Sequence, residues 1–289
     1  MPPVRSAALR FRDLTMILVP LKFLIFSVVL LPLTAWAGTF DQDFAVVYID
    51  ARAEVEFGAV PLSREVLSRG IDRIAQAGAR GLVLKFFLDQ AKDERGDGML
   101  ADSLSRLPTL LQARLDNKEA HPNVLASRFT LVGSFNVAAA GSSAWIPLPR
   151  FAKNARDVGF VDFNSATVPM IEQYQSKGVR SLVLCAIELA EGKAAVLNPG
   201  SQIEIGRRII KVDRLNQAVA RPGKSQSAHG ISFLSLMNGA VDASLLKNKV
   251  VILAYDGAHA EVLSTPYGPM GAHRYFVNIL RSIYDGAKD

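Results

Sequence analysis

Three aspartates, Asp50, Asp89 and Asp256, each stand at the end of an apolar run that has the length of a buried strand. Because the carboxyl ends of parallel strands meet at one edge of a sheet, we expect the three carboxylates to share that edge. Carboxylates grouped in this way can bind a divalent cation, or they can accept hydrogen bonds from loop amides. We predict a ligand-binding role for all three and no bound metal.

A second group of polar residues follows Asp256. His259 and His273 flank a loop that contains two prolines and two glycines, which are residues that fix loop conformation. A strand, a rigid loop and a helix in that order present a site at the carboxyl end of a strand. The residues of this segment that we predict to contact a ligand are Thr265, Pro266, Met270, Gly271 and His273. For Thr265, Pro266 and Gly271, setting the local fold is the favoured role.

Catalysis has little support in the sequence. Ser264 lies near His259 and Asp256, which are the residue types of a nucleophile, a base and an orienting acid. Their order and spacing match no catalytic triad, and no G-x-S-x-G segment is present. A metal-dependent hydrolase that uses Asp50, Asp256 and one of the two histidines is therefore the less favoured alternative.

The sequence has no cofactor signature, and we expect no cofactor. Gly78 and Gly81 lie between a predicted helix and a predicted strand, which is the opposite order from a dinucleotide-binding loop. No G-x-x-x-x-G-K-[ST] segment occurs, and none of the four histidines lies at a metal-binding spacing from another. The single cysteine, Cys185, excludes an intramolecular disulfide, and its apolar neighbours predict a buried, unreactive thiol.

The N-terminus has the features of an export signal. Basic residues precede or enter an apolar run at Phe23–Leu33, and Ala35-Trp36-Ala37 places small residues where a signal peptidase cleaves. We predict a signal peptide over residues 1–37 and export to a bacterial periplasm. The alternative is an uncleaved anchor in the inner membrane, because Met16–Trp36 is long enough to span a bilayer. Met16 is also an alternative start.

The net charge of +6 is concentrated at this end of the chain. Residues 1–37 contain four basic residues and one acidic residue, so the rest of the chain carries a net charge of +3. That remainder contains no block of basic residues with interleaved aromatics. Nucleic acid is therefore not an expected partner.

The hydrophobic pattern predicts an alternation of strands and helices. The expected strands are 44–50, 80–88, 128–133, 158–163, 168–174 and 250–255. The expected helices are 62–75, 99–111, 181–189, 231–237 and 276–283. A hairpin is expected over 203–212, and polar loops are expected at 51–60, 90–98 and 220–229. Asp93, Glu94 and Asp97 are expected to be solvated in the second of these loops.

These elements indicate an α/β fold with a mostly parallel central sheet, flanking helices and an inserted β-hairpin. Residues 44–88 read as a strand, a helix and a strand, so the two strands should be parallel. Hydrophobic residues make up 49% of the sequence, which is enough for a substantial core. No linker or repeat divides the chain, and we predict one domain over residues 38–289.

Short fragments of this chain, in their order and spacing, resemble the second class of CHASE domain. This is an extracytoplasmic sensory module found on bacterial adenylate cyclases, histidine kinases and serine/threonine kinases. The resemblance extends over nearly all of residues 40–285. The matching fragments are Val46–Asp50, Pro61 with Ser63 and Arg64, Ala77–Ala79, Leu82–Leu88, Asp97 with Leu100–Leu104, Gly159–Val161, Lys249–Leu253, Thr265-Pro266, Met270-Gly271 and Arg274–Leu280.

The chain also departs from the family pattern. The tryptophan-rich approach to the proline is absent around Phe57–Val60, and Lys85-Phe86 stands near the place of an aspartate usual in the strand after Arg80. His273 and Tyr275 occupy the places where the family commonly has a glutamate and a histidine. Family members usually continue into membrane helices and an output domain, whereas no apolar run of spanning length follows residue 40 here. That pattern leads us to expect a free periplasmic version, a subunit that works with a membrane partner, or a degenerate relative.

The resemblance implies a sensory or ligand-binding domain that is not an enzyme. Its expected partners are a small ligand of unknown identity and a membrane sensor kinase or cyclase. It also implies a ligand role for Arg64, which begins the helix after Pro61. The main alternative is a structural periplasmic interaction module, in which the loop around Thr265–Gly271 only packs the fold.

Overall fold

The computed structural model of the chain describes residues 38–116, 124–163, 165–221, 230–265 and 268–287. The predicted signal segment, Pro266 and most of the predicted 220–229 loop lie outside the described residues. Residues 37–289 cluster as one compact unit. Within the described ranges, no helix combines the length and the apolar character needed to cross a bilayer.

A mostly parallel sheet forms the centre of the fold. Strand β1 (Phe44–Asp50) pairs in parallel with β16 (Val250–Asp256) along seven residues. Both strands are apolar at nearly every position, as expected for strands that are covered on both faces. The sheet order is β15 (Ile231–Ser232), β1, β16, β2 (Gly81–Leu84), β3 (Thr109–Asp116) and β6 (Ser143–Trp145), with β7 (Asp157–Phe160) also beside β3. Only the pairing of β3 with β6 is antiparallel in this sheet as described.

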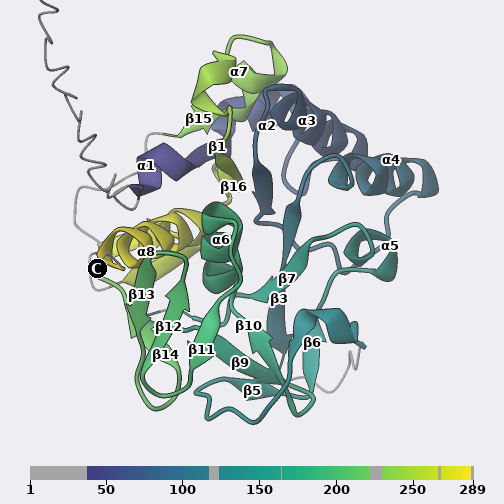
Figure 1. The fold of residues 1–289 in the computed structure, drawn as a ribbon. Helices are drawn as coiled ribbons and strands as arrows, with labels where there is room; N and C mark the ends of the chain where they lie inside the picture. Colours follow the sequence, from purple (N-terminus) through teal and green to yellow (C-terminus); the bar gives the residue numbers. More distant parts are fainter. Residues whose placement is uncertain (1–37, 117–123, 164, 222–229, 266–267, 288–289) are drawn as a thin grey trace, which may run out of the picture. The chain divides into compact units, whose positions relative to one another are not determined.

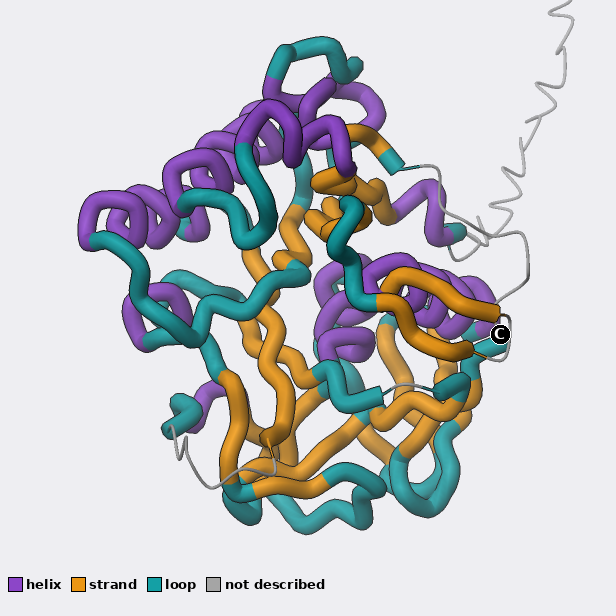
Figure 2. Tube along the Cα trace, turned by 180° about the vertical axis from the view of Figure 1, so that it is seen from behind, coloured by secondary structure: helices purple, strands orange, loops and turns teal. Residues whose placement is uncertain are grey.

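Helices cover both faces of this sheet (Figures 1 and 2). Because side chains alternate along a strand, Val47 and Leu253 pack on one side, and Val46 and Ile252 pack on the other. The first side holds α3 (Arg64–Gln76), α4 (Glu94–Leu104) and α7 (Phe233–Met237). The second side holds α6 (Leu182–Glu191) and α8 (Ala272–Gly286). The core therefore has two layers, one on each side of the sheet.

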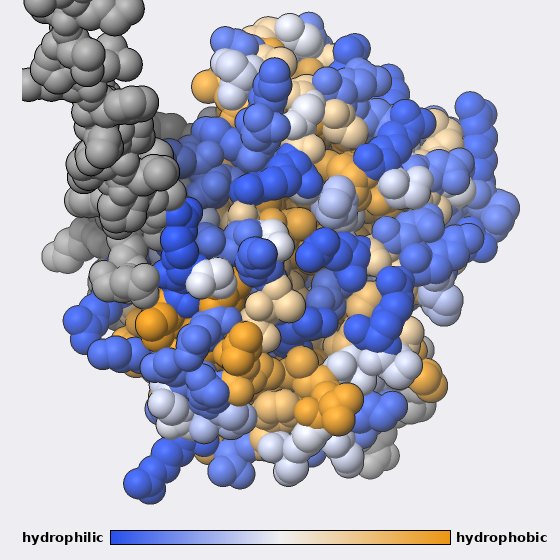
Figure 3. All heavy atoms as spheres, viewed as in Figure 1, coloured by the Kyte–Doolittle hydropathy of each residue, from blue (hydrophilic) through white to orange (hydrophobic). Residues whose placement is uncertain are grey.

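Small antiparallel sheets make up the lower part of the view in Figure 1. They include the predicted hairpin, which is β12 (Gln202–Ile205) with β13 (Arg208–Lys211). Figure 3 shows apolar side chains gathered over this lower part, whereas the region of α4 is largely hydrophilic. The remaining strands are β4 (Thr130–Leu131), β5 (Ala140–Gly141), β8 (Thr167–Pro169), β9 (Ile171–Tyr174), β10 (Lys177–Arg180), β11 (Val196–Asn198), β14 (Gln217–Val219), β17 (Val262–Thr265) and β18 (Gly268–Gly271).

Local sequence explains where the main helices begin and end. The Ser63 hydroxyl accepts a hydrogen bond from the Val66 amide at the start of α3. Ser181 caps α6 in the same way through the Leu184 amide. Gly192 ends α6 in the left-handed conformation, with φ of 63°, which glycine adopts without steric cost. The short helices are α1 (Phe40–Asp43), α2 (Ala51–Phe57) and α5 (Pro149–Ala152), with 3₁₀ turns at Ser127–Phe129 and Ala243–Leu245.

Several predicted elements were wrong in type or extent. Residues 51–57 form α2 rather than a polar loop, because the Asp50 carboxylate caps the Ala53 amide. Helix α4 starts at Glu94 within the predicted 90–98 loop, because Asp93 caps the Gly96 amide.

Two further predicted elements are each divided in the structure, and in the first of them the sequence predicts a break or kink at Pro108. The helix predicted over 99–111 ends at Leu104, and strand β3 begins at Thr109. Pro108 separates the two, because it cannot continue a helix. The strand predicted over 168–174 is divided into β8 and β9, which pair with different strands, β14 and β10.

Strand β7 and helix α6 approach each other closely at Gly159. A Cβ atom at this position would lie 2.4 Å from the Leu182 Cα atom, which is backbone and cannot move aside cheaply. We expect Gly159→Ala to lower the free energy of unfolding by about 1–3 kcal/mol through overpacking. Gly98→Ala in α4 is the control, because a Cβ there meets nothing within 4 Å and alanine favours a helix. Denaturant unfolding that shows both variants at or above wild-type stability would contradict this close packing.

Candidate functional site

A cleft of about 620 Å³ lies at the carboxyl edge of the central sheet. Ile49, Lys85 and Tyr255 line it from the ends of β1, β2 and β16. This is the edge at which the sequence predicted a site. The volume falls within the range of small-molecule pockets, and open α/β sheets bind their ligands at this edge.

A smaller recess of about 260 Å³ adjoins the cleft. Five residues line both spaces, namely Lys85, Phe87, Gln112, Glu261 and His273. The inner wall of the recess comes from β3, from the segment after β7 and from the first turns of α8. The cleft and the recess are therefore two lobes of one site, and the shared residues mark their junction.

Lys85 is the most unusual group at this junction. Its side chain is only 7% exposed, and its Nζ donates a hydrogen bond to the Gln112 Oε1 atom at 2.7 Å. The Nζ atom also lies 5.0 Å from the centre of the Phe276 ring. Burial, together with the positive charge of Arg114, lowers the pKa of Lys85 to about 7. Lys85 therefore exchanges a proton near neutral pH.

His273 lies beside Lys85 and is held in one tautomer. Its Nδ1 atom accepts a hydrogen bond from the Tyr255 amide at 2.8 Å. Burial lowers the pKa of His273 well below its ordinary value, and the charge of Lys85 adds to this effect. The ring is therefore neutral with its proton on Nε2, which makes His273 an N–H donor at the junction.

Aromatic side chains line the larger lobe. Phe87 packs edge-on against Trp145 with ring centres 5.4 Å apart, and Phe86 packs against His273 at 5.7 Å. The Tyr255 hydroxyl donates to Glu54 Oε1 at 2.7 Å and accepts from the His259 amide at 3.0 Å. These contacts fix the rings in place, and they give the lobe a rigid wall that suits a flat or apolar ligand.

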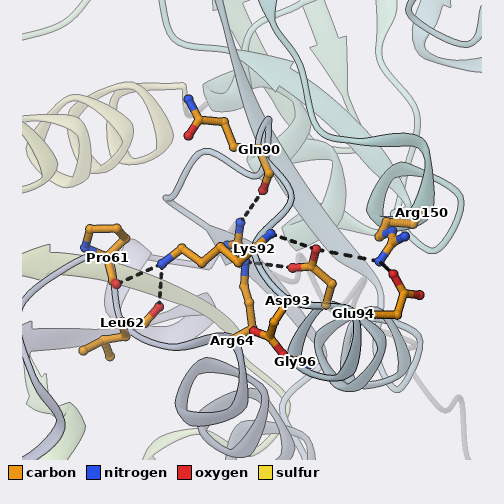
Figure 4. Close-up of polar contacts among 10 residues, drawn as sticks. Pro61, Leu62, Arg64, Gln90, Lys92, Asp93, Glu94, Gly96 and Arg150 are labelled. Carbon is orange, nitrogen blue, oxygen red and sulfur yellow. Dashed lines mark hydrogen bonds and ion pairs between the residues drawn. The ribbon is translucent and has the colours of Figure 1, made fainter.

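Arg64 and Lys92 also line the cleft, where we call them the rim. Figure 4 shows their polar contacts. Its Nε atom lies 3.2 Å from Asp97 Oδ1, and its Nη2 donates to the Gln90 carbonyl at 2.9 Å. The other oxygen of Asp97 accepts from the Lys92 amide at 3.1 Å. The expectation that Asp97 is solvated was wrong, because this carboxylate is 1% exposed and ties α3 to α4. Lys92 completes the rim by donating its Nζ to the Pro61 carbonyl at 3.1 Å.

The three strand-end aspartates do not act as one group. Asp50 and Asp256 pair with each other in the register of β1 and β16, so they share an edge as expected. Asp50 caps α2, and both carboxylate oxygens of Asp256 bind Arg274 in α8. Asp89 lines the cleft. Of the three, only Asp89 therefore faces this site.

The predicted loop residues mainly shape the chain before α8. Residues 262–265 and 268–271 form a hairpin, and the Thr265 hydroxyl donates to the Gly268 carbonyl at 2.7 Å. The Met270 sulfur accepts from Asn278 Nδ2 at 3.2 Å, and Gly271 is the residue that precedes α8. Of the predicted ligand residues, Arg64, Asp89 and His273 line the cleft.

Neither a catalytic triad nor a metal centre forms from the residues considered in the sequence. Asp256 is held by Arg274 rather than by His259, and Ser264 lies in strand β17 outside the lining of the cleft. In the described part of the chain, three potential metal ligands lie within 4.8 Å of one another at one place, Asp157, Cys185 and Glu188.

Arg180 forms ion pairs with two of these three residues. Its guanidinium lies 2.6 Å from Asp157 and 3.5 Å from Glu188. Burial raises the pKa of Cys185 well above its ordinary value, so the thiol stays protonated and is a poor metal ligand. The group is best described as a buried ion-pair cluster.

Sequence reasoning missed Lys85, Gln112, Trp145 and Tyr255 as site residues. Lys85 is a single cation inside an otherwise apolar run, and this interruption was the one signal available. Gln112 follows the helix predicted over 99–111, which gave no reason to place it beside Lys85. Their contact joins two neighbouring strands of the sheet, and only the strand order brings it about.

The low pKa of Lys85 makes stability depend on pH in a defined direction. In the unfolded chain the amine keeps its proton up to about pH 10, whereas in the folded chain it loses the proton near pH 7. Between these values the unfolded state binds more protons, so wild-type stability rises with pH. Relative to Lys85→Met, we expect wild type to gain on the order of 2–4 kcal/mol between pH 6 and pH 10.

Denaturant unfolding at pH 6, 7, 8, 9 and 10 measures this gain. Lys177→Met, at an exposed lysine in β10, is the matched control and should follow the pH dependence of wild type. A constant difference between wild type and Lys85→Met over this range would show that the buried amine keeps its proton.

Comparison with known proteins identifies the family. The chain matches the CHASE2 domain over residues 9–288, which is nearly its whole length. No curated protein and no solved structure matches it. CHASE2 domains are extracytoplasmic sensory modules of cyclases and kinases, and they are typically non-catalytic. The chain, with its parallel sheet, its helices on both faces and its cleft at the carboxyl edge, therefore belongs to the CHASE2 family of sensory domains.

Proposed function

We propose that this chain is an exported periplasmic sensor that binds a small ligand in the cleft and carries out no reaction. It acts with a membrane kinase or cyclase, to which it reports whether the cleft is occupied. The observation that carries this proposal is the two-lobed site at the carboxyl edge of the sheet, with a buried amine at its junction. The rigid aromatic wall and the fixed donors suit binding.

Helix α8 is the element that links the site to the rest of the domain. At its first turn, His273 lines both lobes and Arg274 binds Asp256 at the end of β16. A ligand that contacts His273 therefore acts on a helix that is fixed to the sheet by an ion pair. Buried side chains along the helix, including Phe276, Ile279 and Leu280, make it pack on the sheet as one body.

The other end of α8 holds the residues that follow the predicted signal segment. Asp285 accepts a hydrogen bond from the Phe40 amide at 2.8 Å, and Arg281 pairs with Asp41 at 2.6 Å. Arg208, which is fully buried, donates to both the Tyr284 carbonyl and the Gly38 carbonyl at 2.6 Å. We infer that α8 carries the occupancy of the cleft to residues 38–43, where a membrane partner can detect it.

Trp145 offers a direct measurement of ligand binding. The chain contains two tryptophans, Trp36 and Trp145, and Trp145 lines the cleft. A Trp36→Phe variant, in which Trp145 is the one tryptophan, is screened against a library of small metabolites. We expect a compound that binds in the cleft to change the fluorescence emission of this variant, because the Trp145 ring then loses contact with water. The same compound should raise the melting temperature of the protein.

The matched control is Trp145→Phe with Trp36 retained. It should lose the emission change while it keeps most of the melting shift. A library that alters neither emission nor melting temperature, for wild type and variants alike, would count against ligand sensing and favour the structural interaction module.

Hydrogen exchange tests the role of α8. The compound identified by the emission screen is added at a saturating concentration. We then expect slower amide exchange in residues 272–286, which are α8, and in residues 40–43, because the ligand stabilises the helix that contacts them. Strands β9 and β10, over residues 171–180, lie outside the cleft lining and should be unchanged. Protection that stops at the cleft, with 40–43 unaltered, would reject α8 as the connecting element.

A further inference from the structure

The cations around the cleft differ in how their charge is compensated. Arg64 is buried but pairs with the equally buried Asp97. Lys92 is exposed and donates to two backbone carbonyls at 3.1 and 3.4 Å. Lys85 is buried, and within the described residues its hydrogen-bond partner is the neutral amide of Gln112. Among the described residues of this site, Lys85 is therefore the buried cation that lacks a bonded anion.

The charged groups that face Lys85 do not supply that anion. Arg114 repels it, while Glu261 and Asp162 attract it from a distance. The Glu261 side chain is exposed and screened by water. Asp162 accepts from the Leu115 amide at 2.9 Å and lies 4.0 Å from Arg114. A further negative charge at the junction would therefore be stabilised by the Lys85 amine.

Three residues that can donate hydrogen bonds, Lys85, Gln112 and His273, line both lobes. His273 carries its proton on Nε2, because its Nδ1 accepts from the Tyr255 amide. Gln112 presents its carbonyl oxygen to Lys85, which leaves its amide hydrogens free to donate to a bound group. An ammonium, a ring N–H and an amide NH₂ form a donor set that matches the two oxygens of a carboxylate.

The larger lobe suits the remainder of such a ligand. Phe86, Phe87, Trp145 and Tyr255 line it, so the lobe can enclose a flat or apolar body. Asp89 and Glu261 also lie on its wall, together with Arg64, which pairs with Asp97, and the exposed Lys92. Apart from Lys85, the two carboxylates therefore outnumber the one lining cation that has no ion pair among the described residues. The wall therefore selects for one acidic group and an apolar remainder.

We propose that the ligand of this cleft is a small monocarboxylic acid with an aromatic or apolar body, whose carboxylate binds between Lys85, Gln112 and His273. The body lies in the larger lobe against the aromatic wall. This inference rests on the proposed sensory function and gives its ligand a chemical class. In the described lining, Arg64 and Arg114 already pair with Asp97 and Asp162. A second negative charge, as on a dicarboxylate or on inorganic phosphate, therefore meets no further buried cation that lacks an ion-pair partner.

Matched pairs of probes test the proposal on the full chain. The acids are benzoate, phenylacetate and indole-3-acetate, and each is compared with its own primary amide, which has nearly the same shape and no charge. Binding is measured by Trp145 emission and by calorimetry at pH 7. We expect at least one acid to bind about tenfold or more tightly than its amide, a difference of about 1.4 kcal/mol.

Variants assign the preference to Lys85. Lys85→Met should remove the preference for the acid while leaving amide binding within about threefold of wild type. Lys85→Gln provides a second neutral side chain that can still bond to Gln112, so a fold defect in one variant does not decide the result. Lys177→Met, at an exposed lysine of β10 outside the lining of both lobes, is the matched control and should keep the preference.

Proton uptake gives an independent readout. Because a bound carboxylate stabilises the charged form of Lys85, acid binding at pH 8 should take up close to one proton. Calorimetry in two buffers of different ionisation enthalpy measures this number, which should fall to near zero in both Lys85 variants. Uptake that persists in these variants would overturn the assignment to Lys85.

The outcomes separate this inference from the function on which it rests. If amides bind as tightly as acids, or if phosphate binds through Lys85 and the carboxylates do not, the monocarboxylate is overturned while ligand sensing stands. If neither these probes nor the metabolite library changes Trp145 emission or melting temperature, both proposals fall. An acid preference that Lys85→Met and Lys85→Gln both abolish supports both.

Discussion

The pairing of β1 with β16 is the constraint on which the rest of this structure depends. The two strands come from opposite ends of the described chain, and they pair in parallel from Phe44 with Val250 to Asp50 with Asp256. Side chains alternate between the two faces, so a slip of one residue would exchange the two core layers. This register places Ile49 and Tyr255 on the wall of the cleft and Asp256 opposite Arg274. The position of the site therefore follows from the register in which these two strands pair.

The fold was predictable where the sequence pattern and the final packing agree. Val250–Asp256 is apolar throughout because both of its faces are buried, and the sequence shows this directly. Helix α2 was missed because Ala53 is its one buried residue, which leaves no apolar stripe for periodicity to detect. The helix predicted over 99–111, with a break or kink at Pro108, is confirmed as far as Leu104 and wrong after Pro108, because its leucines keep helical spacing across the proline. Pairing with β2, β7 and β6 makes Thr109–Asp116 a strand.

The site was less predictable than the fold because its contacts join distant parts of the chain. Arg64, Asp89 and His273 were expected near a ligand and do line the cleft. Lys85 was noted as a departure from the family pattern, yet its surroundings include Gln112 in β3 and Phe276 in α8. A sequence gives no sign that these three residues meet. The burial of the amine, which decides its chemistry, follows from strand order and helix packing alone.

The two buried cations at this cleft, Arg64 and Lys85, differ in whether an anion pairs with them. Arg64 meets Asp97, and their ion pair fixes the rim, so its charge contributes to the fold. Lys85 meets a neutral amide and a ring face, so its charge remains an unfavourable feature of the empty site. A fold that only needed packing would favour an apolar side chain there. The amine lies beside the first turn of α8, whose last turn holds residues 38–43, about 20 Å away along a helix of 15 residues. A change of charge at Lys85 therefore acts directly on the element that joins the cleft to the start of the domain.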